Sequence, residues 1–338
     1  MEKSKEPLWK NQRDSFRSAL EYMQGRMRGE IKSLQTPWSK FNDAGIDGIE
    51  WNSTVVIGAR PGTGKTLIKD QLVREAFIRN PGEGIRALEF QLEMMGRVSA
   101  MREYSAILAK PYKYVCSADK LQGKLTTEDF DRCINYAQKR VEYPIDVVDT
   151  ACTVKTFKYI IEQYMETYAV TISGKKIYQK TIVTLDHTIL LKRDVNESTL
   201  NDMLYSLGEA LTDLKRRYPI IFIILSQLNR NIDSPERAED GRQGNYILTS
   251  DIFGADALLQ HADMLVGIDR PAGRNIFYYG PSRYIVDSED LLVGHFLKCR
   301  NGDTRISFFK AEFDKMRMVE IPTPPTQTQQ RNIKTQKV

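Results

Sequence analysis

The sequence is poor in the residues that build covalent and metal-bound frameworks. It has four cysteines and three histidines in 338 residues, and no two cysteines form a Cys-x-x-Cys pair. Disulfide frameworks and zinc sites need ligands at recurring close spacings, so neither is indicated. A low content of scattered cysteines is typical of a reducing compartment, and we expect a cytoplasmic location.

Long hydrophobic runs and a strong charge imbalance are also absent. No apolar run approaches the roughly 18 residues of a membrane span, and the polar N-terminus lacks the apolar stretch of a secretory signal. The chain has 49 basic and 44 acidic residues, a net charge of +5. This excess is too small to establish nucleic-acid binding by itself. A membrane partner is excluded, and any argument for DNA must come from local sites.

What the sequence does contain is an alternation of short apolar strands and amphipathic helices. Strands are predicted at 54–57, 87–90, 145–148, 181–185, 220–225 and 264–268. Buried strands that alternate with helices predict an α/β fold, with a mostly parallel sheet flanked by helices on both faces. Segments 291–298 and 305–311 bracket Asn301 and Gly302, a strong hairpin signal. We therefore expect a C-terminal antiparallel extension.

The two ends of the chain differ from this central pattern. Apolar residues from Phe16 to Leu34 recur at helical spacing and predict a linker helix, which packs either on its own domain or on a neighbouring subunit. The segment rich in Pro, Thr and Gln at the other end predicts a disordered polar tail. The expected organisation is an N-terminal arm and linker helix (1–36), one main domain (37–320) and the tail (321–338). Residues 170–178 look like a small inserted hairpin.

The most informative motif is a phosphate-binding loop at 58–66, between the first strand and a helix. Glycines in this loop allow backbone amides to turn toward a phosphate, and the helix N-terminus adds positive potential. The lysine reaches the terminal phosphates and the threonine can ligate Mg²⁺. The predicted binding residues are Arg60, Pro61, Gly62, Thr63, Gly64, Lys65 and Thr66.

Hydrolysis also requires a carboxylate for the metal and a base that orients water. Asp186 closes an apolar strand, at the edge where parallel sheets bind their ligands. Glu93 follows the strand at 88–92 and can reach the same edge. Gln227 follows a third strand, where its amide could sense a γ-phosphate. These three residues are the candidate catalytic residues beside the phosphate-binding loop.

Taken in order, these motifs resemble the RecA-like P-loop NTPase domain of DnaB-type replicative helicases, which are hexameric motors. The shared segments are 59–66, 92–94, the strand that ends at Asp186, 226–230 and 298–302. The resemblance implies ATP and Mg²⁺ as cofactors. It also implies that Lys65 binds phosphate, that Thr66 and Asp186 hold Mg²⁺, that Glu93 is the general base, and that Gln227 reports phosphate state. Lys298 and Arg300 would act on the ATP of a neighbouring subunit.

The sequence departs from the family pattern in three places. His187 stands where a tyrosine often follows the metal aspartate, and we interpret it as a packing residue. Phe253 replaces an arginine that presents itself to DNA phosphate. Helicases of this family usually carry a helical collar or a primase domain before the linker helix, whereas the sequence has roughly 15 residues there. Other candidate DNA contacts lie in the loops at 229–244 and 192–198, namely Arg230, Arg237, Arg242, Lys192 and Arg193. Acidic neighbours offset the arginines of the first loop, which is equally well read as a solvated turn.

The predicted function is an ATP-dependent DNA helicase, 5′ to 3′ by resemblance, that works as a homohexamer on single-stranded DNA. A primase or a loader is a candidate partner, and the compact form suggests a phage-type protein in a bacterial host cytoplasm. Two alternatives stay open. One is a recombinase or KaiC-like ATPase that does not unwind DNA, and the other is a scaffold or loader that binds ATP only to assemble.

Overall fold

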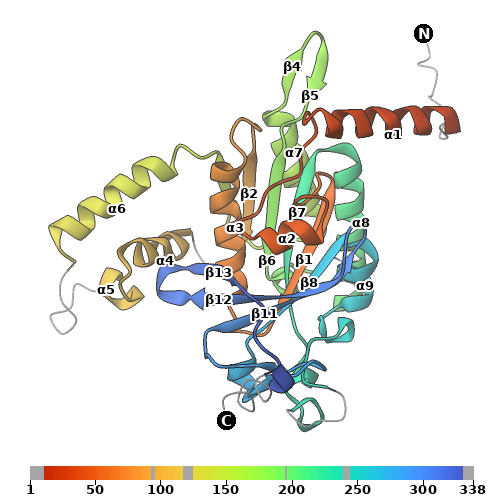
Figure 1. Cartoon of the computed structure of the whole chain (residues 1–338). Coiled ribbons are helices and arrows are strands. Elements are labelled where there is room, and N and C mark those ends of the chain that lie inside the picture. Colours follow the sequence, from red (N-terminus) through yellow and green to blue (C-terminus); the bar gives the residue numbers. More distant parts are fainter. Residues whose placement is uncertain (1–10, 93–95, 117–124, 195, 239–243, 330–338) are drawn as a thin grey trace.

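The computed structural model describes the chain except for residues 1–10, 93–95, 117–124, 195, 239–243 and 330–338. Within the described ranges, nine strands form one sheet in the order β13-β12-β11-β8-β1-β7-β6-β2-β3 (Figure 1). The strands are β1 (Ser53–Ala59), β2 (Arg86–Gln91), β3 (Ile145–Val148), β6 (Thr181–Asp186), β7 (Ile220–Gln227), β8 (Met264–Asp269), β11 (Leu291–Cys299), β12 (Arg305–Glu312) and β13 (Arg317–Ile321).

The sheet has a parallel part and an antiparallel part, as the sequence predicts. Strands β8, β1, β7, β6, β2 and β3 run parallel to one another. Strands β11, β12 and β13 continue the sheet in antiparallel fashion. Strand β13 was not predicted from the sequence. The expected hairpin insertion is present as β4 (Val170–Ile172) and β5 (Lys175–Ile177), and Ser173 and Gly174 between them both have positive φ.

Helices cover both faces of the sheet. The helices are α1 (Gln12–Met27), α2 (Ser39–Ala44), α3 (Lys65–Arg79), α4 (Gly96–Leu108), α5 (Tyr112–Cys116), α6 (Thr127–Arg140), α7 (Val154–Thr167), α8 (Leu200–Arg217) and α9 (Ala255–His261). Helices α7, α8 and α9 share one core with the sheet, and α2 and α3 share the other. Side chains of β1 alternate between these cores, Val56 in the first and Val55 and Ile57 in the second. Both faces of the central strand are therefore buried, which explains its uninterrupted apolar run.

A separate small cluster holds α4, α5 and α6 together beside the sheet. Leu108, Val115 and Cys133 are its buried residues, one from each helix. Figure 1 shows this group at the left, away from the strands at the centre of the sheet. No helix in the described ranges is long and apolar enough to cross a membrane.

The structure differs from the sequence predictions at both ends of the chain. Helix α1 ends at Met27, seven residues before the predicted end, because Gly29 takes a left-handed φ of +70°. Leu34 lies in the core, and its main chain exchanges two hydrogen bonds with that of Ile49. The main domain therefore begins slightly before residue 37. The predicted tail is ordered up to residue 329: the carbonyl of Pro325 accepts a hydrogen bond from the amide of Ile285 at 3.0 Å. Residues 330–338 lie outside the described residues.

Candidate nucleotide site

The phosphate-binding loop connects the central strand β1 to helix α3. Hydrogen bonding to β7 and β8 on either side fixes β1, so the loop starts from a rigid edge. Gly62 and Gly64 have φ values of +77° and +103°, which side chains with a Cβ rarely adopt. Lys65 and Thr66 are the first two residues of α3, and the unsatisfied amides of the helix N-terminus lie behind them. The sequence prediction for this segment is confirmed as geometry: a strand, a turn with two left-handed glycines, and a helix.

Thr66 and Asp186 meet at the next part of the site. The Thr66 hydroxyl donates to Asp186 Oδ2 at 3.4 Å, and Asp186 is 4% exposed. Its other carboxylate oxygen, Oδ1, is buried and has no hydrogen-bond partner among the described residues. A buried carboxylate oxygen without a partner is costly unless a cation completes it. A hydroxyl beside a carboxylate is an oxygen donor set that suits Mg²⁺, so these residues fit the metal.

A cavity of about 360 Å³ lies against this edge. It is lined by most of the phosphate loop and Leu67 after it, and by His187 and Gln227. Three lining residues come from segments that the sequence motifs do not indicate: Arg102, Phe313 and Met316. Arg102 comes from α4, and Phe313 begins the short helix η6 (Phe313–Lys315) after β12. The Phe313 ring comes so close to Gly64 that a Cβ there would lie 3.3 Å from it. No motif links these distant segments in the sequence. Helix α4 packs on η6, so the two segments meet beside the loop.

His187 and Gln227 are joined at the ends of two neighbouring strands. Their side chains approach to 2.6 Å, Nε2 to Nε2, and both border the cavity. This corrects the interpretation of His187 as a packing residue. Gln227 ends β7 and borders the cavity, and its role as a sensor of phosphate stays a prediction. Glu93, the predicted base, lies outside the described residues, although its strand β2 ends at Gln91 directly beside Asp186.

A buried charge cluster supports helix α3 one turn after the loop. Lys69 is 1% exposed and forms ion pairs with Asp70 at 2.8 Å and with Glu89 of β2 at 2.9 Å. Burial opposes the charge of Lys69, but the two carboxylates outweigh it and hold the pKa of the ammonium above its usual value. Burial raises the pKa of Asp70 to about 6 in spite of Lys69. The cluster ties the phosphate-loop helix to the strand that leads toward Glu93.

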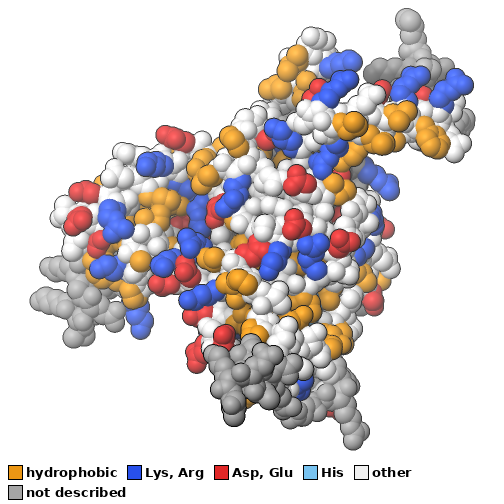
Figure 2. All heavy atoms as spheres, in the orientation of Figure 1, with side chains coloured by type: hydrophobic (Ala, Val, Ile, Leu, Met, Phe, Trp, Pro, Cys, Tyr) orange, Lys and Arg blue, Asp and Glu red, His pale blue; other side chains and the backbone are white. Residues whose placement is uncertain are grey.

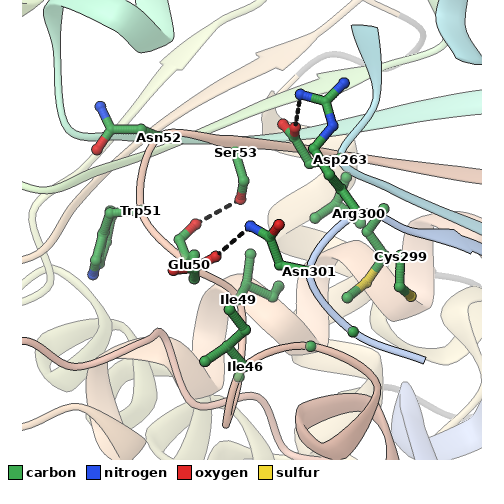
Figure 3. Close-up of a pocket in the computed structure, with 15 residues that line it drawn as sticks. Ile46, Ile49, Glu50, Trp51, Asn52, Ser53, Asp263, Cys299, Arg300 and Asn301 are labelled. Carbon is green, nitrogen blue, oxygen red and sulfur yellow. Dashed lines mark hydrogen bonds and ion pairs between the residues drawn. The ribbon is translucent and has the colours of Figure 1, made fainter. Parts of the chain in front are cut away.

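Lys298 and Arg300 lie at the opposite end of the sheet. In β11, Cys299 pairs with Met264 at the start of β8, whereas the end of β1 pairs with Ile268. Along β8, the residue beside Cys299 and the residue beside the end of β1 are four positions apart, which corresponds to about 13 Å of strand. Arg300 Nη1 bonds Asp263 Oδ1 at 3.1 Å, and this pair borders a small pocket that also contains Glu50 and Asn301 (Figure 3). Lys298 donates to the Leu259 carbonyl, and burial lowers its pKa. Within one chain, neither side chain joins the phosphate site.

A model of the DnaB-like helicase C-terminal domain matches residues 33–317 of this sequence. The chain belongs to that family. No curated protein matches it in sequence. Solved structures show the same fold: one that is described as an ATPase domain is 18% identical with a TM-score of 0.71, over 90% of this chain and 98% of that one.

Two further solved structures are similar to this chain, with lower TM-scores. A DnaB-like replicative helicase, described together with its interactions with primase, is 17% identical with a TM-score of 0.69 over 86% of this chain. The chain spans 64% of the length of that helicase. A KaiC-like protein from the archaeon Pyrococcus horikoshii is 14% identical with a TM-score of 0.50, over 86% of this chain and all of that one. The parallel sheet with flanking helices is thus the RecA-like fold that the DnaB-like domain was predicted to have.

The DnaB-like domain places its candidate DNA residues in different environments. Arg237 is 3% exposed, and its guanidinium bonds Asp251 at 2.7 and 2.8 Å and the carbonyl oxygens of Gly244 and Tyr246. A buried guanidinium with these partners does not reach a phosphate, so its prediction as a DNA contact is wrong. Arg242 lies outside the described residues.

Three predicted DNA residues of the DnaB-like domain are exposed. Arg230 begins η2 (Arg230–Asp233), directly after β7, and Lys192 and Arg193 follow the turn after β6. Both loops therefore leave the carboxyl edge of the sheet from neighbouring strands. The loop after β7 is also tied to the phosphate loop, because Arg60 forms an ion pair with Asp233 at 2.6 Å.

Proposed function

We propose that this DnaB-like domain is an ATP-driven DNA helicase motor, which works as a homohexameric ring on single-stranded DNA and moves 5′ to 3′. The observation that carries the proposal is the separation of the site into two halves. The loop, Thr66 and Asp186 lie at one end of the sheet, and Lys298 and Arg300 lie at the other. A ring in which one subunit's first half faces the next subunit's second half joins them.

Within one subunit, the proposed chemistry is the hydrolysis of ATP. Lys65 and the loop amides hold the phosphates, and Phe313 and Met316 provide an apolar wall beside the loop. Mg²⁺, held by Thr66 and Asp186, would neutralise charge that develops on the phosphates. Glu93 would orient the attacking water. Arg300 of the next subunit would stabilise the transition state, a contribution of about 10³ to 10⁵ in rate for an arginine finger.

The test of this assignment is ATP turnover in three proteins. Wild type is expected to hydrolyse ATP. Lys65→Ala is expected to lose binding and turnover together, whereas Glu93→Gln should still bind ATP but lose turnover. Unchanged turnover in both variants would refute the site. Tight binding without turnover in the wild type would favour the alternative of an ATP-dependent scaffold or loader.

Helix α1 supports the proposal of a ring. It projects from the body as an arm, and its apolar residues are visible along it (Figures 1 and 2). Phe16, Leu20, Met23 and Met27 are between 57% and 85% exposed, a stripe of four large side chains on one helix. Such a stripe needs a partner surface. We propose that it packs on the neighbouring subunit, and mass measurement with and without ATP and oligonucleotide tests this.

The proposed DNA contacts are Arg230, Lys192 and Arg193, which would bind phosphates from the carboxyl edge. One observation favours a second candidate, a KaiC-like ATPase without unwinding activity. Phe253 occupies the position of the DNA-contacting arginine, and its ring packs on the core instead. Strand displacement on a forked duplex separates the two. ATP turnover and DNA binding without displacement would favour the second candidate. A primase or loader as partner also remains part of the proposal.

A further inference from the structure

The chain turns sharply where strand β6 ends. His187, directly after Asp186, has a φ of +73°, a left-handed conformation that costs a non-glycine residue about 1–3 kcal/mol. In a continued strand, the side chains of residues 186 and 187 would point to opposite faces of the sheet. The left-handed turn instead lets both approach the nucleotide site: Asp186 bonds Thr66, and His187 lines the cavity. The unusual backbone thus delivers an imidazole to the site.

The imidazole reaches Gln227 on the neighbouring strand. Their Nε2 atoms are 2.6 Å apart. An amide nitrogen only donates hydrogen bonds, so in this arrangement the Gln227 amide donates and His187 Nε2 accepts. One N–H of Gln227 is then committed to His187, which leaves the amide oxygen and the second N–H for a ligand in the cavity. The contact with His187 therefore determines which polar atoms of the Gln227 amide point into the cavity.

The main chain of Gln227 is held independently. Its carbonyl accepts from the amide of Phe253 at 2.8 Å, and the neighbouring Ser226 hydroxyl donates to the Phe253 carbonyl at 3.1 Å. Since these bonds fix the strand end, the direction of the side chain depends on its contact with His187. A sensor that discriminates a γ-phosphate needs such a fixed direction, because misplaced groups lose most of their effect.

We propose that His187 is a positioning residue that holds the Gln227 amide toward the site of the γ-phosphate. It links the strand that carries the metal aspartate to the strand that carries the sensor. The inference rests on the proposed function, in which Gln227 reports phosphate state. It also gives a reason for the departure from tyrosine at this position: the chain uses an imidazole acceptor beside the metal aspartate.

The experiment compares four variants with the wild type. His187→Gly keeps the left-handed backbone without strain and removes the ring. His187→Asn tolerates the same backbone and keeps an amide. Gln227→Ala and the double variant His187→Gly with Gln227→Ala complete a double-mutant cycle. For each, thermal unfolding reports folding, and titration with Mg²⁺ plus either ADP or a non-hydrolysable ATP analogue reports affinity.

We expect His187→Gly to lower the preference for the ATP analogue over ADP roughly tenfold and to leave ADP affinity unchanged. His187→Asn should lie between it and the wild type. The double variant should be no worse than Gln227→Ala alone, because the two residues act as one unit. An unchanged preference in His187→Gly, or losses that add in the double variant, would overturn the inference. If His187→Gly does not fold, the same cycle with His187→Asn decides.

The outcome separates this inference from the proposed function. A wild-type protein that binds neither nucleotide, or never hydrolyses ATP, would refute the proposed function itself. A wild-type protein that prefers the ATP analogue and hydrolyses ATP, with His187 and Gln227 contributing independently, would refute only the role of His187.

Discussion

Asp186 has two carboxylate oxygens in different situations. One accepts from Thr66, and the other is buried without a partner among the described residues. A protein that buries such an oxygen loses stability unless a ligand uses it. The residue thus combines a structural cost with a position beside the phosphate loop, which is the pattern expected of a metal ligand rather than of a core residue.

The first prediction concerns this carboxylate. Asp186→Asn keeps the shape and removes the charge that attracts Mg²⁺. We expect ATP turnover to fall about a hundredfold or more, since a metal supplies several kcal/mol of charge stabilisation. Nucleotide affinity measured in EDTA should change little, whereas the gain in affinity on adding Mg²⁺ should disappear. A variant that still gains affinity with Mg²⁺ would place the metal elsewhere.

His295 in β11 provides a prediction about pH that is independent of the site. It is buried, its Nε2 lies 2.8 Å from the Tyr279 hydroxyl, and burial lowers its pKa to about 4. In the unfolded chain this histidine takes up a proton near pH 6.5, whereas in the folded chain it does so only near pH 4. Its contribution to the free energy of unfolding is therefore fully present above about pH 6.5. This contribution is lost as the pH falls from 6.5 toward 4, on the order of 3 kcal/mol in full.

We expect the wild type to lose about 2 kcal/mol of unfolding free energy from this group between pH 7 and pH 5. Carboxylates titrate over part of the same range, so denaturant unfolding of His295→Gln at both pH values serves as the comparison. The variant should be less stable at pH 7 but lose less on acidification. Equal losses in the two proteins would show that His295 is not the source.

At the scale of elements, the sequence was most informative where a pattern is local. The strands of the parallel sheet are buried on both faces, so each appears as an apolar run, and the hairpin around Ser173 and Gly174 carries its own turn signal. Helix α1 was predicted too long because its stripe continues past Gly29, where the backbone turns left-handed. The order of residues 322–329 comes from pairing with the segment near Ile285, a long-range contact that composition does not record.

The site shows the same division. The loop, Thr66 and Asp186 were predictable because strand ends of a parallel sheet converge on one edge. Arg102 and Phe313 were not, because they reach the cavity through the packing of α4 on η6. Arg237 was misassigned since a charged residue in a polar loop looks exposed in a sequence, whereas its partner Asp251 lies 14 residues away in the chain.

Helix α1 carries a prediction at this scale. Its arm is attached to the body through Tyr22, whose hydroxyl donates to Glu50, and Glu50 also accepts from Asn301 at 2.9 Å (Figure 3). Asn301 is next to Arg300, so the arm and the turn that carries Arg300 share one anchor. An arm that packs on a neighbour would therefore help to fix the arginine relative to that neighbour.

Charge on the apolar stripe should weaken assembly without unfolding the subunit. We expect Leu20→Asp with Met23→Asp to raise the concentration for half-assembly about tenfold or more, because each apolar side chain contributes about 1 to 2 kcal/mol when buried. The thermal midpoint of the dilute subunit should stay the same, as both residues are exposed. Ser18→Asp, also exposed on α1, is the matched control for added charge. Equal effects of control and test variants would exclude the stripe as the interface.

At the scale of the whole molecule, the proposed site is divided between two ends of the sheet, and the proposal joins its halves across a boundary between subunits. Lys65 and Arg300 lie at opposite ends of the sheet, so a single chain never brings both to one nucleotide. Asp263 holds the Arg300 guanidinium at the surface, where 52% of its side chain is exposed and able to meet a partner. In a ring, each Arg300 would face the phosphate loop of the neighbouring subunit. The ATPase activity of a mixture of two variants would therefore depend on which variants are neighbours in the ring.

The last prediction uses this dependence. Lys65→Ala and Arg300→Ala are each expected to be inactive as pure proteins, because every interface lacks one group. In an equal mixture of freely exchanging subunits, roughly a quarter of the interfaces combine an intact Lys65 with an intact Arg300, so ATP turnover should return to a measurable fraction of wild type. Mixing Lys65→Ala with Lys65→Ala, Arg300→Ala double variant is the control, since no intact interface arises. Activity that stays absent while labelled subunits are seen to exchange would contradict a shared site, whereas full activity of pure Arg300→Ala would show that one subunit hydrolyses ATP alone.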